Sequence, residues 1–321
     1  MIKQMIGIDI GGTAIKLALI DVYGEIHKKW QIPTNISDNG RKIPTDIISS
    51  IQHTILDQKH QESEIIGVGI GVPGPISPDG QTVVRAVNLG WEDMPLKSAI
   101  EKELDIPVVL LNDANAAALG EMWKGAARGK ASLVFITLGT GVGGGIIIDG
   151  KVINGVHSSG GEIGHIPVYS EEKRVCGCGN INCLETFASA NGFVKTMKML
   201  LPDKTTKFTA VDIFDWAKAD DSKAKEALAI TVTYLGKAIA GIMNTVDAEE
   251  VVIGGGLSGA GTALLKPLKE QIDRSIFPAI RGNYKLSRAQ LGNDAGIYGA
   301  VYSYLSSDDS LTFEETTGIN A

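Results

Sequence analysis

The chain has 321 residues, of which 44% are hydrophobic and 21% charged, so it can bury a sizeable core and is not extensively disordered. Its net charge of −7 argues against a nucleic-acid partner, because phosphate backbones are bound by clustered Lys and Arg. No apolar run approaches the roughly 18 residues of a membrane span, and Asp9 interrupts the first run too early for a signal peptide. We therefore expect a cytoplasmic protein of two domains that binds neither nucleic acid nor membrane.

The first predicted elements form a strand, a glycine turn and a second strand. Apolar runs at 5–10 and 15–20 are separated by Gly-Gly-Thr at 11–13. A third extended segment follows at 25–32. Two adjacent glycines let the backbone approach an anion, with N–H groups pointing into the gap and the Thr13 hydroxyl beside them. A plain hairpin turn would explain the same letters, so the motif alone leaves both interpretations open.

The next notable feature is a strand that ends in polar residues. Asn112 and Asp113 follow an apolar strand and precede an alanine-rich helix. Open α/β sheets place ligand chemistry at the carboxyl ends of their strands. Asp and Asn are also ordinary helix N-caps, so the pattern leaves Asp113 between capping and catalysis. The elements expected in this part are helices at 43–55, 94–104 and 113–123 and strands at 65–72, 83–87 and 107–111.

Residues 133–153 repeat the layout of the opening segment, which indicates an internal duplication with one copy per domain. A strand at 133–138 leads into a glycine stretch at 139–145, and further strands follow at 146–148 and 151–153. The stretch matches the dinucleotide fingerprint Gly-x-Gly-x-x-Gly, but that fingerprint must open a helix, whereas a hairpin pattern follows here. A nucleotide-dependent dehydrogenase is therefore disfavoured. A P-loop is excluded because no Gly-x4-Gly-Lys-Ser/Thr occurs.

All three cysteines lie in one short stretch, at Cys176, Cys178 and Cys183, and His165 precedes them. Three thiolates and one imidazole make a complete tetrahedral shell for Zn²⁺, and a closed shell indicates a structural metal. A disulfide is a poor alternative, because the count is odd and Cys-x-Cys closes a very small ring. Three buried free thiols beside an unrelated histidine remain the other interpretation.

Two carboxylates flank the predicted metal set. Glu162 lies three residues before the histidine, and Glu185 lies two residues after the last cysteine. Closure around a metal would bring both acids toward one place, so we expect the zinc to position a polar pocket.

The last third of the chain contains a glycine run, 254–256, between a strand and a helix. Such a run gives a ligand close access to a helix N-terminus, although a tight turn would explain it as well. The polar tail 306–321 is expected to be disordered. The expected strands are 250–253 and 285–291. The expected helices are 184–201 with an irregularity at 191–192, 211–219, 224–246, a helix that follows residue 259 and ends at about 276, and 294–305.

Together, and in this order, these motifs resemble the ROK family of sugar kinases and sugar-responsive repressors. The resemblance covers residues 6–305, and its most specific part is GGEIGH followed by CGCGNINCLE. Two departures concern the metal loop. Asn182 stands where the family usually has glycine, and the loop between His165 and Cys176 is about one residue longer than usual. Neither departure removes a ligand, so they bear on the local turn and not on the metal.

The resemblance implies an α/β protein with the duplicated actin-like (ribonuclease H-like) ATPase fold, in which two lobes enclose a cleft. Residues 1–112 would form the small lobe, to which helix 294–305 would return. Residues 113–293 would form the large lobe, with the zinc-binding loop at 165–183.

The resemblance also implies an activity, namely ATP-dependent phosphorylation of glucose at its 6-hydroxyl to give glucose 6-phosphate and ADP. Asp113 would be the general base, Mg²⁺ would accompany ATP and be bound by Asp9 through water, and Zn²⁺ would be structural. A homodimer or higher homo-oligomer is expected. The implied site residues are Asp9, Gly11, Gly12, Thr13, Gly139, Thr140 and Gly141 for the ATP phosphates; Gly254, Gly255 and Gly256 for adenosine; Asn88, Asn112, Asp113, Glu162, His165 and Glu185 for the sugar; and His165, Cys176, Cys178 and Cys183 for the metal.

Alternatives remain at this stage. The hexose could be N-acetylmannosamine, fructose, mannose or allose, and the phosphate donor could be polyphosphate. A sugar-sensing repressor of the same family is a further alternative, although a repressor needs a DNA-binding segment before the first strand, which starts here by about Met5. It would also have no need of Asp113.

Overall fold

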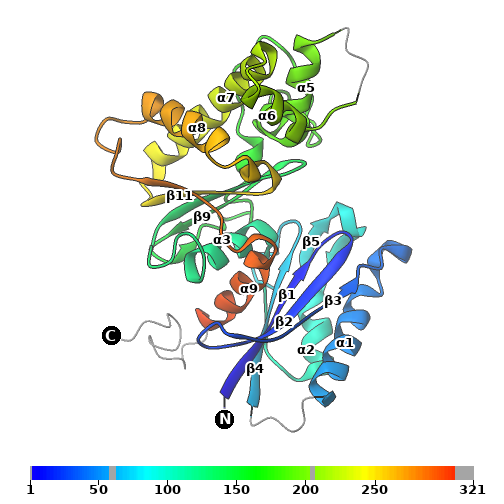
Figure 1. Cartoon of the computed structure of the whole chain (residues 1–321). Coiled ribbons are helices and arrows are strands. Elements are labelled where there is room, and N and C mark those ends of the chain that lie inside the picture. Colours follow the sequence, from blue (N-terminus) through cyan, green and yellow to red (C-terminus); the bar gives the residue numbers. More distant parts are fainter. Residues whose placement is uncertain (1, 58–62, 203–206, 308–321) are drawn as a thin grey trace. The chain divides into compact units, whose positions relative to one another are not determined.

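The computed structural model describes residues 2–57, 63–202 and 207–307, and the tail beyond residue 307, where disorder was predicted, lies outside them. The chain divides into two compact units (Figure 1). Unit 1 comprises Met1–Gly129, Asn154–Gly160 and Asn293–Ala321, and unit 2 comprises Lys130–Ile153 and Gly161–Gly292.

Unit 1 contains a five-stranded mixed sheet in the order β3-β2-β1-β4-β7. The first three strands pair antiparallel, as the glycine-turn pattern predicted, while β4 and β7 run parallel to β1. The strands are β1 (Ile2–Ile10), β2 (Ala14–Asp21), β3 (Ile26–Pro33), β4 (Ser63–Val72) and β7 (Val108–Asn112).

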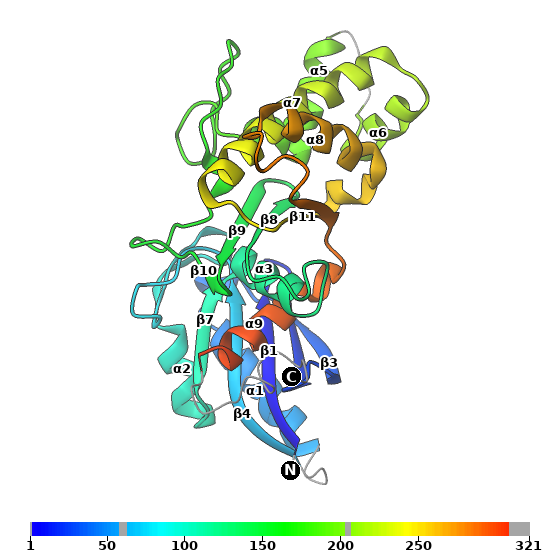
Figure 2. The same cartoon turned by 90° about the vertical axis from the view of Figure 1, so that its left-hand side faces the viewer.

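Helices cover both faces of this sheet, α1 and α2 on one and α3 and α9 on the other (Figures 1 and 2). The alternation of strand side chains explains the two layers. Ile6 and Ile8 of β1 belong to the core with α1 and α2, whereas Met5 belongs to the core with α9. The helices are α1 (Ile43–Asp57), α2 (Leu96–Leu104), α3 (Asp113–Trp123) and α9 (Ala295–Leu305).

Glycines in the sheet allow α9 to lie close to it. A Cβ on Gly7 would be 2.7 Å from Cγ2 of Ile297, and one on Gly69 would overlap the backbone carbonyl of Ala300. Larger residues at these positions would push the helix outward. The C-terminal helix is thus part of unit 1.

A short hairpin of unit 1 was only half predicted. Strand β5 (Val83–Ala86) was expected, but its partner β6 (Trp91–Met94) was not, and α2 begins at Leu96 instead of at residue 94. The 3₁₀ segment η2 (Val87–Leu89) follows β5, and the chain then pairs back on β5 as β6.

Unit 2 repeats the arrangement, with the sheet order β10-β9-β8-β11-β12. Again three antiparallel strands are joined by two parallel ones, which confirms the predicted duplication. The glycine stretch was expected to be a turn up to residue 145, but β9 begins at Val142, because these glycines pair in register with β8. The strands are β8 (Leu133–Leu138), β9 (Val142–Ile148), β10 (Lys151–Val152), β11 (Glu250–Gly254) and β12 (Lys285–Arg288).

The helices of unit 2 pack on this sheet around one apolar core. The helix predicted at 184–201 is broken at Ser189, two residues before the expected irregularity. The helix predicted after residue 259 begins at Thr262, after the 3₁₀ segment η4 (Gly256–Ala260). The helices are α4 (Glu185–Ala188), α5 (Ala190–Leu200), α6 (Ala210–Lys218), α7 (Ser222–Val246) and α8 (Thr262–Ser275).

Helix α7 is long and apolar enough to cross a membrane by length and composition alone. Its side chains Leu235, Ile239 and Met243 are fully buried in the core of unit 2. A core helix passes the same test, so α7 is weak evidence for a span.

The predicted boundary between the lobes lies just before α3. Helix α3 packs against α9 within unit 1, and the first segment of that unit continues to Gly129. The assignment of functional lobes stays a prediction.

Candidate functional site

The tip of the β1–β2 hairpin offers unused backbone amides. Gly11 N donates to Ala14 O at 3.0 Å, and Thr34 holds the tip by donating from Oγ1 to Gly11 O at 2.6 Å and from N to Thr13 O at 3.1 Å. Within the described residues, the N–H groups of Gly12 and Thr13 donate to no protein acceptor. A hairpin tip that is fixed by its carbonyls and keeps two free N–H groups is suited to an anion.

Asp9 lies beside this tip. Its Oδ2 is 3.0 Å from Nζ of Lys16, and the side chain is 18% exposed. One partly exposed carboxylate next to an anion site suits Mg²⁺, which is usually held by one or two carboxylates together with water and substrate phosphates. The donor set therefore fits the predicted ion.

Asn88 lies close to the same tip. It is exposed in η2, and its Nδ2 would be 3.5 Å from a Cβ placed on Gly12. Unit 1 thus brings a predicted sugar-contacting amide together with a predicted phosphate loop.

The structure separates the roles of Asn112 and Asp113. Asn112 is the N-cap of α3, and its Oδ1 accepts from Ala114 N at 2.9 Å and Asn115 N at 3.3 Å. Its Nδ2 donates to Gly74 O at 3.2 Å. Asp113 is the first residue of the helix, is exposed, and accepts from Ala114 N at 2.8 Å. Because Asn112 fills the capping position, capping alone does not explain Asp113. The sugar contact of Asn112 stays a prediction.

The second glycine turn, in unit 2, resembles the β1–β2 tip because it too has backbone N–H groups without a protein acceptor. Gly139 N donates to Gly141 O at 3.0 Å, and Gly139 O accepts from Ala190 N at 2.9 Å. In the described part of the chain, the N–H groups of Thr140 and Gly141 have no protein acceptor. A Cβ on Gly141 would be 2.5 Å from Oε2 of Glu185, which also accepts from the N–H of the next residue at 3.3 Å. This turn therefore joins a predicted phosphate loop to a predicted sugar ligand.

The glycine run after β11 lies against the start of this turn. Gly255 has φ 76°, and a Cβ there would be 2.5 Å from N of Leu138, the residue before Gly139. Gly254 ends β11, and Gly256 opens η4 with no atom within 4 Å of its Cβ position. The predicted adenosine residues thus neighbour the predicted phosphate loop.

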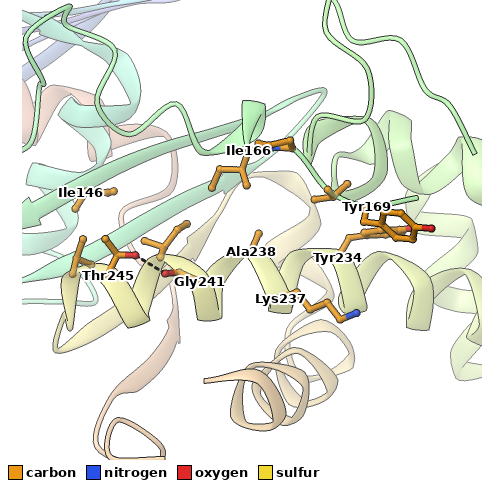
Figure 3. A pocket seen from close by; sticks show the side chains of 12 residues that line it. Ile146, Ile166, Tyr169, Tyr234, Lys237, Ala238, Gly241 and Thr245 are labelled. Carbon is orange, nitrogen blue, oxygen red and sulfur yellow. Dashed lines mark hydrogen bonds between the residues drawn. The ribbon is translucent and has the colours of Figure 1, made fainter. Parts of the chain in front are cut away.

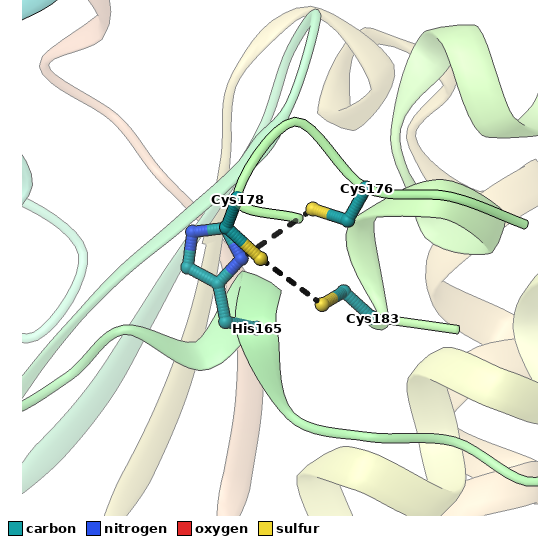
Figure 4. A group of neighbouring side chains, drawn as sticks. All are labelled: His165, Cys176, Cys178 and Cys183. Carbon is teal, nitrogen blue, oxygen red and sulfur yellow. Dashed lines mark hydrogen bonds between the residues drawn. The ribbon is translucent and has the colours of Figure 1, made fainter. Parts of the chain in front are cut away.

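The four predicted metal ligands form one cluster (Figure 4). Their ligand atoms all lie within 4.8 Å of one another. Sγ of Cys178 is 3.6 Å from Sγ of Cys183, and Sγ of Cys176 is 3.6 Å from Nδ1 of His165. A tetrahedral Zn²⁺ with bonds of about 2.3 Å to sulfur and 2.05 Å to nitrogen requires S–S separations of about 3.8 Å and S–N separations of about 3.6 Å. The cluster fits a zinc ion.

The protein environment affects the three thiols differently. Burial raises the pKa of Cys176 to about 12 and also raises the pKa of Cys183. The backbone N–H of Asn180 lowers the pKa of Cys178. Zinc binds thiolates, so a bound ion would replace the protons of all three.

The two flanking acids both lie beside the cluster, Glu162 next to His165 and Glu185 next to Cys176. Nδ1 of His165 faces the sulfur atoms, while its Nε2 is 3.9 Å from Oε2 of Glu162. Oε1 of Glu185 is 3.2 Å from Sγ of Cys176. A metal on Nδ1 would fix N–H on Nε2 and leave it as a donor on the side of Glu162.

Sequence reasoning missed Arg174, which anchors the metal loop. Its side chain is 2% exposed, and its guanidinium donates to Thr186 O at 2.8 Å and to Thr196 Oγ1 at 3.0 Å. Its backbone N donates to Oδ1 of Asn182 at 2.7 Å. The letters Glu-Glu-Lys-Arg resemble an ordinary solvated charge run, so no sequence signal identified the residue.

Asn182 explains one departure from the family pattern. It has φ 59°, which an asparagine tolerates better than most residues. Its Nδ2 also donates to Ser170 O at 3.2 Å. The side chain therefore stabilises the turn that glycine usually makes.

Two cavities in the described part of unit 2 are relevant to the site. One, of about 400 Å³, is lined by Thr140, Gly141, Cys176 and Glu185, and so joins the phosphate loop to the metal loop. The other, of about 510 Å³, lies along α7 and is mainly apolar (Figure 3). It contains none of the predicted site residues.

The sequence pattern of the ROK family matches residues 5–306. The chain is 43% identical to a glucokinase of Halalkalibacterium halodurans, over 96% of this chain and 97% of that protein. It is 32% identical to a xylose repressor of Caldicellulosiruptor bescii, over 98% of this chain and 80% of that protein. A crystal structure of a ROK family glucokinase from Streptomyces griseus in complex with glucose and AMPPNP superposes with a TM-score of 0.71 at 32% identity, over 92% of this chain and 97% of that one. The predicted resemblance is thereby confirmed, and the chain belongs to the ROK family.

Proposed function

We propose that this protein transfers the terminal phosphoryl group of ATP to the 6-hydroxyl of glucose. The main support for this proposal is that two hairpin tips have free backbone N–H groups, Gly12–Thr13 in unit 1 and Thr140–Gly141 in unit 2. Phosphoryl transfer requires mainly positioning and charge stabilisation, which such tips supply. Similarity to proteins named glucokinase supports the choice of reaction.

Asp113 is the proposed general base. It is exposed at the carboxyl end of β7, and Asn112 already caps the helix that it opens. Accepting the proton of the attacking hydroxyl is worth about 10²–10⁴-fold in rate. Mg²⁺, when bound, neutralises phosphate charge, and Asp9 would hold it.

The proposed sugar contacts are Asn88, Asn112, Glu162, His165 and Glu185. Carboxylates that accept from sugar hydroxyls discriminate against analogues without them, because an acceptor that the bound sugar covers is then left unpaired. Zinc would act on this site indirectly, by fixing the ring of His165 and the loop before Glu185.

A panel of sugars and donors tests the reaction. Purified protein is assayed with glucose, N-acetylmannosamine, fructose, mannose and allose, each with Mg·ATP or polyphosphate. We expect the highest kcat/KM with glucose and ATP. A clear preference for N-acetylmannosamine would contradict the proposed substrate.

Asp113→Asn tests the mechanism. The variant keeps the shape and a hydrogen bond to the 6-hydroxyl, so glucose affinity should stay within about tenfold, while kcat falls by roughly two to four orders of magnitude. The control is Asp215→Asn on α6, where the acid pairs with Lys218 on the surface. Unchanged turnover in Asp113→Asn would refute the role of base.

A sugar sensor is the second candidate, because the chain is also similar to a xylose repressor. A sensor would bind sugar with no turnover of ATP, and the same panel would reveal it. The predicted homo-oligomer and the cytoplasmic location stay predictions.

A further inference from the structure

The cavity of about 510 Å³ in unit 2, which we call the α7 cavity, contains none of the residues of the proposed glucose and ATP site (Figure 3). It lies between residues 234–246 of α7, Ile146 of β9 and residues 166–169, which follow the 3₁₀ segment η3 (Ile163–His165). Its volume is within the range of about 300–1,000 Å³ that small-molecule sites occupy, and like them it is lined mainly by apolar side chains.

The walls of the α7 cavity are fixed by contacts within unit 2. The carbonyl oxygen of Ile166 accepts from Leu184 N at 2.8 Å, which ties the segment after η3 to the metal loop. On the other wall, the centre of the Tyr234 ring is 4.3 Å from that of Phe187. A cavity with fixed walls does not have to be ordered by its ligand, and this lowers the free-energy cost of binding.

Gly241 keeps part of the cavity open. Glycine destabilises a helix interior relative to alanine, so a glycine there is usually explained by a close neighbour. Gly236 of α7 has one, because a Cβ on it would be 2.6 Å from Cγ of Gln271. Gly241 lies in the same helix and lines the cavity, yet a Cβ on it would have no atom of the described chain within 4 Å. The packing of unit 2 therefore does not require this glycine, whereas a side chain there would occupy space in the cavity.

Polar groups gather at one end of the α7 cavity. Figure 3 shows Lys237, Tyr234 and Tyr169 at the end away from Ile146. Within the described residues, the Lys237 ammonium and the two tyrosine hydroxyls have no hydrogen-bond partner. Lys237 is also the only charged side chain among the described residues that line the cavity. The cavity thus offers one cation and two hydroxyls at one end and an apolar surface along the rest.

A second copy of the chain fits this charge poorly. A two-fold contact brings the same surface of both copies together, so the residues of the lining would face one another. No described residue of the lining is acidic, so a second copy would offer Lys237 another ammonium and no carboxylate. A small molecule with an acidic group matches the charge and requires no symmetry.

We propose that the α7 cavity binds a small organic acid with an apolar body, such as a medium-chain or aryl carboxylic acid. The acidic group lies between Lys237 and the hydroxyls of Tyr169 and Tyr234, and the apolar body extends past Gly241 toward Ile146. The inference goes beyond the proposed function and does not depend on it.

Two fluorescent probes of similar shape test the charge. Anilinonaphthalene sulfonate has an acidic group, and phenylnaphthylamine is its neutral analogue. Each is titrated onto the full chain at low salt, and we expect a single saturable site. Lys237→Met should weaken binding of the sulfonate about three- to tenfold, a modest factor because the lysine is exposed and water screens its charge. The neutral probe should bind within about twofold of the wild type.

Lys223→Met is the matched control for the charge. Lys223 is another exposed lysine of α7, and it pairs with Glu226 outside the cavity lining. The control should bind both probes as the wild type does.

Gly241→Leu tests the place of binding. The leucine would occupy the cavity, so both probes should bind at least about tenfold more weakly. Ala229→Leu is the matched control, because Ala229 is exposed on α7 outside the lining, and it should bind both probes as the wild type does. Thermal unfolding of all variants shows whether they are folded.

Several results would overturn the inference. They are a wild type that binds neither probe, wild-type affinity in Gly241→Leu, an equal loss of both probes in Lys237→Met, and a comparable loss in either control. A wild-type dimer that Gly241→Leu converts to a monomer would assign the cavity to a second copy, and this too would overturn it. None of these results bears on the proposed phosphorylation of glucose.

Discussion

Replacement of Arg174 by methionine should destabilise unit 2 measurably. The guanidinium is almost fully buried, donates to Glu172 and to the Thr186 carbonyl at 2.8 Å each, and stacks 4.1 Å from the centre of the Phe187 ring. Methionine fills much of the same space without donors. The acceptors would then lose a charged partner.

The magnitude follows from how those acceptors are placed. Removing one partner of a buried ion pair costs about 3–5 kcal/mol. Glu172 is 28% exposed and can be hydrated, and O of Gly192, another acceptor of Arg174, also accepts from Thr196 Oγ1. These features favour the low end, about 3 kcal/mol. For a unit of this size, that corresponds to a loss in Tm of about 6–12 °C.

Differential scanning calorimetry of metal-loaded protein measures the effect. Arg281→Met is the control, because Arg281 is exposed, and it should change stability by about 0.5 kcal/mol or less. Zinc content should be determined in parallel, since a loosened loop would lower it. A Tm for Arg174→Met within about 2 °C of the wild type would refute the argument from buried charge.

Three further predictions concern the metal, a turn and the packing of α9. Cys178→Ser should lower the zinc content from about one ion per chain, measured by elemental analysis, and raise the KM for glucose, measured by steady-state kinetics. Active wild-type protein without zinc would contradict this prediction. The melting temperature should be highest for the wild type and lower for Asn182→Gly, which loses two side-chain hydrogen bonds. It should be lowest for Asn182→Ala, because alanine adds backbone strain of about 1–2 kcal/mol. Gly69→Ala should destabilise strongly because its Cβ overlaps the backbone of Ala300, whereas Gly241→Ala, with nothing within 4 Å, should be neutral or stabilising; equal effects would contradict the packing argument.

Much of the fold could be predicted because hydrophobic period and turn residues act locally. The hairpin after 133–138 was correctly distinguished from a dinucleotide fold, since apolar residues and an Asp-Gly turn follow the glycines. The extent of β9 could not be predicted, because glycine has low strand propensity and only pairing with β8 places it in the sheet. Strand β6 was also missed, because only its pairing with β5 makes these residues a strand.

Some residues of the candidate site could likewise be predicted from the sequence, and others could not. The metal set could be predicted, because ligand type and number are visible in the letters His165, Cys176, Cys178 and Cys183. Arg174 could not, since its burial depends on the packing of α5 against the metal loop.

The contact of Glu185 with Gly141 likewise joins residues far apart in the chain. The pairing of Asp9 with Lys16 could have been found, because a tight hairpin centred on residues 11–14 places them opposite each other.

The place of α9 in unit 1 has a consequence for biosynthesis. The apolar surface that it covers, which includes Met5, Ile20 and Trp123, comes from the first part of the chain, whereas the helix itself begins at Ala295. At a synthesis rate of roughly 5–20 residues per second, the ribosome needs on the order of 10 to 30 s to make the intervening chain. During that time unit 2 can be completed, while unit 1 still exposes the site of its last helix. The first part of the chain to be made is therefore the last to finish folding, and it is the part on which chaperones would act.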